Sequence, residues 1–152
     1  MPRRAALAVA GALAIACARA PQDPVERLLA ALEAAVEERD AAAFVEQLAP
    51  EFRGQGALDR AGAGAELRRW FALYESVSVE RAPADVTRDG AATLVSVRVI
   101  FSAKPKLEGR FGLVASESSP IRFDLRCREH EGALRVTDVA WAEEAPPVAP
   151  PQ

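Results

Sequence analysis

Few side chains in this sequence could carry out chemistry, because the chain contains one histidine, His130, and two cysteines, Cys17 and Cys127. His130 lies between Glu129 and Glu131, in a Glu129–Gly132 segment that is typical of a tight turn between two strands. Solvent would surround a side chain at such a tip, whereas a general base must reach a bound substrate. We therefore expect no catalytic role for His130.

Asp138 and Tyr74 are the best acid–base pair that the sequence offers. Asp138 shares the strand parity of the apolar residues Leu134 and Val136, which would turn it toward their face. Val139, however, carries apolar character on the opposite parity. The strand must therefore be buried on both faces or contain a β-bulge.

Asp124 is the second carboxylate within a strand pattern. It alternates with apolar residues and shares its parity with Arg122, Arg126 and Arg128, while Arg98 has a similar placement on an earlier strand. This arrangement predicts a solvent-facing charge ladder in which an aspartate offsets neighbouring arginines. Exposed pairs of this kind contribute only about 0–1 kcal/mol each.

Several classes of site are missing from the sequence. We find no Cys/His ligand cluster, no phosphate-binding glycine loop and no hydrolase elbow, so we expect no metal and no cofactor. The formal net charge is −3. A nucleic-acid surface requires clustered positive charge, so no nucleic-acid partner is expected.

The N-terminal segment has the layout of an export signal. Arg3 and Arg4 precede a short apolar run, Leu7–Ala16, and small residues surround Cys17. The run LAIAC resembles a bacterial lipoprotein signal, in which the cysteine becomes the first mature residue and is acylated. We expect residues 1–17 to act as the signal and the mature protein to be periplasmic and lipid-anchored to a bacterial membrane. Cleavage after Ala18 is the alternative.

Acylation of Cys17 would leave Cys127 without a partner for an intramolecular disulfide. Cys127 shares the apolar parity of Ile121, Phe123 and Leu125. It is therefore expected to be a small core residue and not a nucleophile.

Three helices are expected to follow a short tether, residues 18–22. Asp23 can cap the first helix, with Pro24 at its first position and Glu26 closing a capping box. Asp40 should cap a second helix over residues 41–48, and Asp59 a third over residues 60–73. The apolar positions of the first helix form one stripe: Val25, Leu28, Leu29, Leu32 and Val36.

Strands should occupy most of the remaining chain. A short strand or turn is expected at residues 51–56, and alternating valines predict a strand around residues 77–79. Asp89–Gly90 predicts a two-residue hairpin turn. A long strand over residues 93–101 is followed by a long loop, residues 104–119, and then by a pair of strands, residues 121–141. A proline-rich tail, residues 145–152, is expected to be disordered.

Two segments give this order of elements a specific resemblance. EERDAAAFVEQLAPEF (Glu37–Phe52) resembles the helix-turn-helix opening of the nuclear transport factor 2-like superfamily, and REHEGALRVTDVAW (Arg128–Trp141) resembles its last hairpin. The resemblance implies one α+β domain over residues 23–144, a cone fold. In that fold three N-terminal helices pack on a curved antiparallel sheet of four to six strands. It also implies a pocket between helices and sheet, although the large apolar residues that could line it could instead fill the core: Trp70, Tyr74, Phe101, Phe123 and Trp141.

The superfamily contains isomerases, dehydratases, non-catalytic ligand carriers and dimeric scaffolds, so the fold does not select a function. Its enzymes generally place histidine, aspartate or tyrosine groups deep in the pocket, and this chain has no obvious matching histidine. We therefore expect a non-catalytic ligand-binding or accessory role with a small apolar ligand. One alternative is an isomerase or hydro-lyase that uses Asp138 and Tyr74. Another is an interaction module that forms a homodimer through the outer sheet face.

Overall fold

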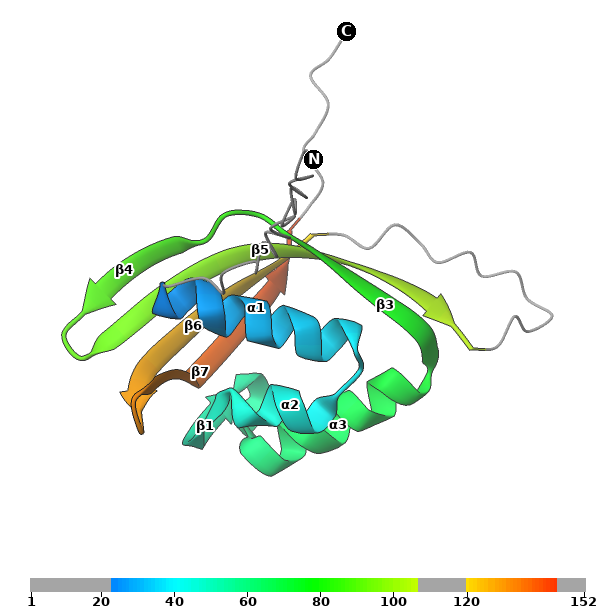
Figure 1. Ribbon diagram of the computed structural model, residues 1–152, viewed down its shortest axis with the longest axis horizontal. Coiled ribbons are helices and arrows are strands. Elements are labelled where there is room, and N and C mark those ends of the chain that lie inside the picture. Colours follow the sequence, from blue (N-terminus) through cyan, green and yellow to red (C-terminus); the bar gives the residue numbers. More distant parts are fainter. Residues whose placement is uncertain (1–22, 107–119, 145–152) are drawn as a thin grey trace, which may run out of the picture.

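The computed structural model describes residues 23–106 and 120–144 (Figure 1). The expected signal with Cys17, the tether, most of the expected long loop and the proline-rich tail lie outside these residues.

The three expected helix N-caps are confirmed. The carboxylate of Asp23 accepts hydrogen bonds from the backbone N–H groups of Val25 and Glu26. Asp40 and Asp59 cap the next two helices in the same way. The helices are α1 (Pro24–Glu37), α2 (Ala41–Glu46) and α3 (Arg60–Ala72), with a short 3₁₀ turn, η1 (Gln55–Ala57), before the third.

Two details around the helices differ from expectation. The Glu26 carboxylate does not close a capping box but binds the guanidinium of Arg81 at 3.0 Å. Helix α2 ends two residues early, because the Gln47 carbonyl accepts a hydrogen bond from the backbone N–H of Val136 and Leu48 already belongs to a strand. Pairing with a distant strand therefore overrides local helix propensity at this point.

The sheet has seven strands and is mixed, whereas four to six antiparallel strands were expected. The first strand runs parallel to the last, and the other pairs are antiparallel. The spatial order is β2-β1-β7-β6-β5-β3, with β4 also paired to β5. The strands are β1 (Leu48–Gly54), β2 (Leu58–Asp59), β3 (Tyr74–Arg81), β4 (Asp85–Asp89), β5 (Ala92–Pro105), β6 (Ile121–His130) and β7 (Ala133–Glu143).

Two tight turns connect the antiparallel neighbours. Asp89 pairs with Ala92, so the β4–β5 turn is centred on Gly90–Ala91, one residue later than expected. The β6–β7 turn consists of Glu131 and Gly132, with φ values of 49° and 79°. Two successive positive φ values are the property of a type I′ hairpin turn.

Helix α1 lies across the concave face of the curved sheet (Figure 1). Its first half packs on the small aliphatic residues of β5, β6 and β7, among which Val95, Cys127 and Val136 are fully buried. Its end joins a second cluster with α2, α3 and β3. The members of that cluster are Val36, Ala41, Phe71 and Val77.

Candidate functional site

A row of aromatic side chains crosses the concave side of the domain near the end of α1. The Trp70 ring lies 5.0 Å from Tyr74 and 6.1 Å from Phe101, and Phe101 lies 6.1 Å from Phe123 (centroid to centroid). Phe123 is the register partner of Trp141 across β6 and β7. We call these five residues the aromatic arc. The structure thus brings four of the five predicted ligand-binding residues together as ring neighbours and places Trp141 beside Phe123 on the next strand.

Four neighbouring strands and one helix position the arc, and Tyr74 is the first residue of β3. Phe101, Phe123 and Trp141 come from β5, β6 and β7, where Phe123 has the parity of the core residue Leu125. Trp70 lies in the last turn of α3, and its ring packs against the second cluster. The backbone N–H of Trp141 donates to the Gln55 side-chain oxygen at 3.0 Å, which ties the end of β7 to η1.

The arc packs against the core and also keeps exposed ring surface. Four of its members are half-buried, and Trp141 is 38 % exposed. Val95 and Val136 on the same sheet face are only 2 % exposed. Exposed ring faces can stack on a flat apolar molecule. None of the five residues is charged and only Tyr74 is ionisable, so the arc by itself offers binding surface and little acid–base chemistry.

A β-bulge resolves the parity conflict of β7. Val136 pairs with Cys127 and Asp138 pairs with Arg126, so Thr137 is an extra residue between two ladder positions. The Thr137 hydroxyl lies 2.8 Å from an Asp138 carboxylate oxygen and 3.0 Å from the Arg126 carbonyl oxygen.

The bulge sends the predicted catalytic pair to different places. Asp138 faces the outer side of the sheet, while Tyr74 packs on Trp70 in the arc. Strands β6 and β5 lie between the strands that carry the two residues. Asp138 and Tyr74 therefore do not form an acid–base dyad.

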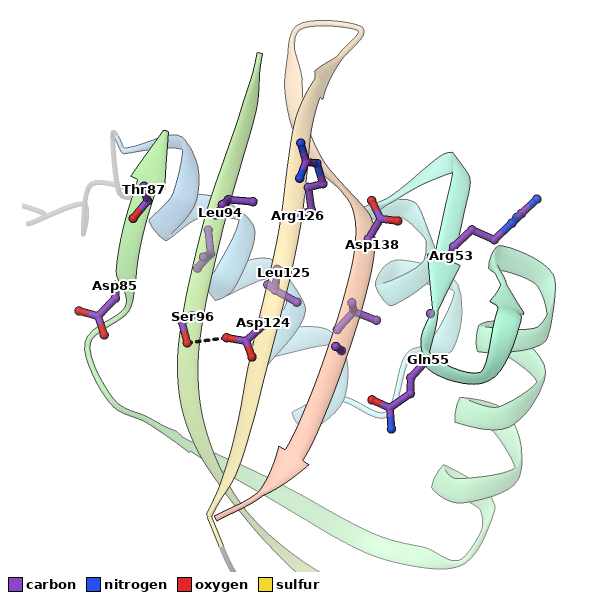
Figure 2. Close-up of a pocket in the computed structure, with 14 residues that line it drawn as sticks. Arg53, Gln55, Asp85, Thr87, Leu94, Ser96, Asp124, Leu125, Arg126 and Asp138 are labelled. Atoms are coloured by element: carbon purple, nitrogen blue, oxygen red, sulfur yellow. Dashed lines mark hydrogen bonds between the residues drawn. The ribbon is translucent and has the colours of Figure 1, made fainter. Parts of the chain in front are cut away.

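Asp138 instead lines a hollow of about 550 Å³ on the outer sheet face, opposite the helices (Figure 2). Strands β5, β6 and β7 form its floor, with β4 along one side and β1 and η1 along the other. The sequence did not indicate this hollow, because its sides come from segments far apart in the chain. Its lining comprises Arg53, Gly54, Gln55, Asp85, Thr87, Leu94, Val95, Ser96, Asp124, Leu125, Arg126, Asp138, Val139 and Ala140.

The predicted charge ladder lies on this outer face. Asp124 accepts a hydrogen bond from the Ser96 hydroxyl at 2.7 Å and one from Arg122 at 3.3 Å. Arg98 pairs with Glu144 and not with Asp124, and the hydrogen bond that Arg98 donates to the Glu144 carboxylate raises the pKa of the Arg98 guanidinium. The side chains of Arg98, Arg122 and Asp124 are about half exposed, and that of Glu144 is less so.

Similarity to known proteins is found at the level of structure. No family model matches the chain, and no curated protein sequence matches it. Among solved structures, 278 chains match. One is a candidate dehydratase of the NTF2-like family from Streptomyces avermitilis, with a TM-score of 0.68, 12 % identity, and coverage of 81 % of this chain and 96 % of that chain. Another is an NTF2-like protein of unknown function from Pseudomonas putida KT2440, with a TM-score of 0.62, 16 % identity, and coverage of 78 % and 82 %.

A third match is a candidate scytalone dehydratase from Novosphingobium aromaticivorans, with a TM-score of 0.67 and 8 % identity, covering 80 % of this chain and 83 % of that chain. This chain has the NTF2-like cone fold. At these identities the similarity concerns the fold alone.

The remaining reactive groups of the described residues lie away from the arc. His130 is the last residue of β6, pairs with Ala133 and is half-buried, so it precedes the turn and does not form its tip. Cys127 is 0 % exposed, and burial raises the pKa of its thiol to about 11. Within residues 23–106 and 120–144, no group of His, Cys, Asp and Glu side chains could hold a metal ion. No helix in the same ranges is long and apolar enough to cross a membrane.

Proposed function

We propose that this protein is an exported, lipid-anchored domain that binds a small apolar ligand at the aromatic arc without catalysing a reaction. The observation that carries the proposal is the incomplete burial of the arc, whose five aromatic side chains keep ring surface exposed. By contrast, the aromatic core residues Phe52 and Phe71 are only 2 % and 5 % exposed.

The chemistry of the arc favours a flat and uncharged ligand. Each aromatic pair adds about 0.5–1.5 kcal/mol beyond its buried area, so two or three stacked rings would add about 1–4.5 kcal/mol to the free energy gained from burying the ligand. A charged ligand group would be desolvated there without a partner from the arc. The separation of Asp138 from Tyr74 removes the pair on which an isomerase or hydro-lyase would depend, and this supports a non-catalytic role.

Intrinsic fluorescence can test the proposal, because both tryptophans of the chain, Trp70 and Trp141, belong to the arc. We expect N-phenyl-1-naphthylamine, an uncharged aromatic probe, to quench this fluorescence saturably at micromolar concentration. Trp141→Ala should weaken probe binding about tenfold, which corresponds to about 1.4 kcal/mol. The matched control is Val86→Ala, an exposed apolar residue on β4. A wild-type protein that shows no saturable quenching would sink the proposal.

Anchoring is proposed through acylation of Cys17. Mass spectrometry of the mature N-terminus should find a diacylglyceryl or triacyl modification on this residue, and Cys17→Ser should move the protein from the membrane fraction to the soluble one. Unchanged fractionation of Cys17→Ser would contradict the anchor without affecting the proposal for the arc.

A homodimer through the outer sheet face is a second proposal, supported by charge placement around the hollow. Asp85 lies on the β4 side and Arg53 on the β1 side (Figure 2). A two-fold axis along the strands would bring Asp85 of each copy opposite Arg53 of the other. Light scattering should find a dimer that Asp85→Arg weakens and that a double exchange, Asp85→Arg with Arg53→Asp, restores. A monomer at 100 μM would rule it out.

A further inference from the structure

We infer that the anchored domain stands on the end of the cone where α1 begins, so that the aromatic arc is directed away from the bilayer. This inference rests on the proposed acylation of Cys17. It assigns the side from which a ligand reaches the arc, the aqueous side and not the membrane.

The tether limits the distance between the start of α1 and the membrane. Five residues, 18–22, separate Cys17 from the helix cap Asp23. An extended chain spans at most about 3.6 Å per residue, so the tether reaches about 20 Å and on average less. The first turn of α1 is therefore held close to the lipid surface.

Helix α1 separates that point from the arc. Val25, in its first turn, packs in the aliphatic core, whereas Val36, near its end, belongs to the cluster against which Trp70 and Tyr74 pack. At about 1.5 Å per residue, the 14 residues of α1 span roughly 21 Å. The β4–β5 and β6–β7 turns lie at the same end of the domain as the start of α1 (Figure 1).

Acidic and basic side chains are mixed at the end of the domain where α1 begins, so their charge does not attract this end to an anionic membrane. Exposed acidic side chains there, Asp23, Asp89, Glu129 and Glu131, offset the exposed arginines Arg27, Arg88 and Arg128. An anionic lipid surface attracts clustered basic residues, which this end does not present. The orientation of the domain is therefore set by the tether and not by electrostatic attraction to the lipid surface.

The opposite orientation has one argument in its favour. Leu73 is 61 % exposed and Trp141 is 38 % exposed at the arc end, and tryptophan partitions into membrane interfaces. Placing these two side chains in the bilayer would raise the start of α1 by about the length of that helix. The tether would then be almost fully stretched, which costs chain entropy at every residue. We therefore assign the arc to the aqueous side.

Site-specific fluorescence on the acylated full-length protein can test this orientation. The variants Ala91→Cys, in the β4–β5 turn, and Leu73→Cys, beside the arc, each add one accessible thiol. Cys127 is buried and Cys17 would be acylated, so neither competes for the label. Labelled protein is reconstituted into phosphatidylcholine–phosphatidylglycerol vesicles that contain a lipid with a spin-labelled head group. We expect at least threefold stronger quenching at position 91 than at position 73.

The outcomes separate the orientation from the anchor. Protein that sediments with the vesicles but shows equal quenching at both positions, or stronger quenching at position 73, overturns the orientation and leaves the anchor intact. Protein that does not sediment with the vesicles overturns the anchor and with it the orientation. The same labelled variants carrying Cys17→Ser should stay in the supernatant and give the unquenched reference.

Discussion

The two ends of the cone use the same sheet face in different ways. At the end where α1 begins, small aliphatic side chains fill the space, and Val95 and Val136 are 2 % exposed. At the other end, the rings of Trp70, Tyr74, Phe101 and Phe123 lie 5.0–6.1 Å apart. Trp141, the strand partner of Phe123, is 38 % exposed. The first end is thus closed by packing, whereas the second leaves aromatic surface exposed, as the proposed ligand site requires.

The bulge at Thr137 divides β7 between these two tasks. Before it, Val136 completes the closed core. After it, Trp141 reaches the same sheet face at the open end, while Asp138 turns outward. One strand can serve both ends because the extra residue resets the alternation of its side chains.

The largest effect on the free energy of unfolding is expected from truncating a buried side chain in the aliphatic core, at the end of the cone where α1 begins. Phe52 is 2 % exposed within the aliphatic core, so Phe52→Ala should lower the free energy of unfolding by about 3–5 kcal/mol through lost burial and a residual cavity. Phe123 is half-buried in the aromatic arc, so Phe123→Ala should lower the free energy of unfolding by less than half as much. Urea unfolding measures both, and equal losses would remove the distinction between the two ends.

An alkaline titration should show the next largest effect. Burial raises the pKa of the Cys127 thiol from 9.0 to about 11 in the folded state. Between these values the unfolded chain releases a proton that the folded chain retains, so the free energy of unfolding should fall by about 1.4 kcal/mol per pH unit. Unfolding measured from pH 8 to pH 11 should show this slope, and Cys127→Ala should lack it. An identical slope in the variant would assign it to other groups.

Removing the hydroxyl group at the β-bulge should lower the free energy of unfolding by a smaller amount than the two changes above. Thr137 is 5 % exposed, and its hydroxyl lies within hydrogen-bond distance of the Arg126 carbonyl and the Asp138 carboxylate. Thr137→Val keeps the shape but removes the donor, which should cost about 1–2 kcal/mol. Ser78→Ala, which removes an exposed hydroxyl contact on β3, is the matched control and should cost under about 0.5 kcal/mol. A neutral Thr137→Val would show that the bulge does not depend on this hydroxyl.

The smallest effect is expected on the outer face. Arg122 contacts Asp124 at 3.3 Å with both side chains about half exposed. Arg122→Ala should therefore change the free energy of unfolding by less than about 0.5 kcal/mol and leave probe binding at the arc unchanged. A loss of probe binding in this variant would mean that the two sheet faces are coupled.

Local signals in the sequence predicted the helices well. Asp23, Asp40 and Asp59 each cap a helix through hydrogen bonds to residues two or three places ahead, so neighbouring residues alone determine these starts. The end of α2 and the parallel pairing of β1 with β7 could not be predicted in this way. They depend on contacts such as that between Gln47 and Val136, which lie far apart in the sequence.

For the candidate site, too, only the features that depend on local sequence patterns could be predicted. The aromatic arc follows from strand parity and helical spacing once the cone fold is assumed. The side on which Asp138 lies did not follow, because parity allowed either a bulge or a strand buried on both faces, and only the register with β6 decides. The outer hollow combines β4 with β1 and η1, and no local pattern connects them.

The position of Cys127 also bears on how the chain would mature. A protein exported as proposed folds among oxidants, where a thiolate is the species that exchanges with disulfides. In the folded domain this sulfur is shielded and protonated at neutral pH. Once the sheet forms, burial therefore protects this thiol from disulfide exchange.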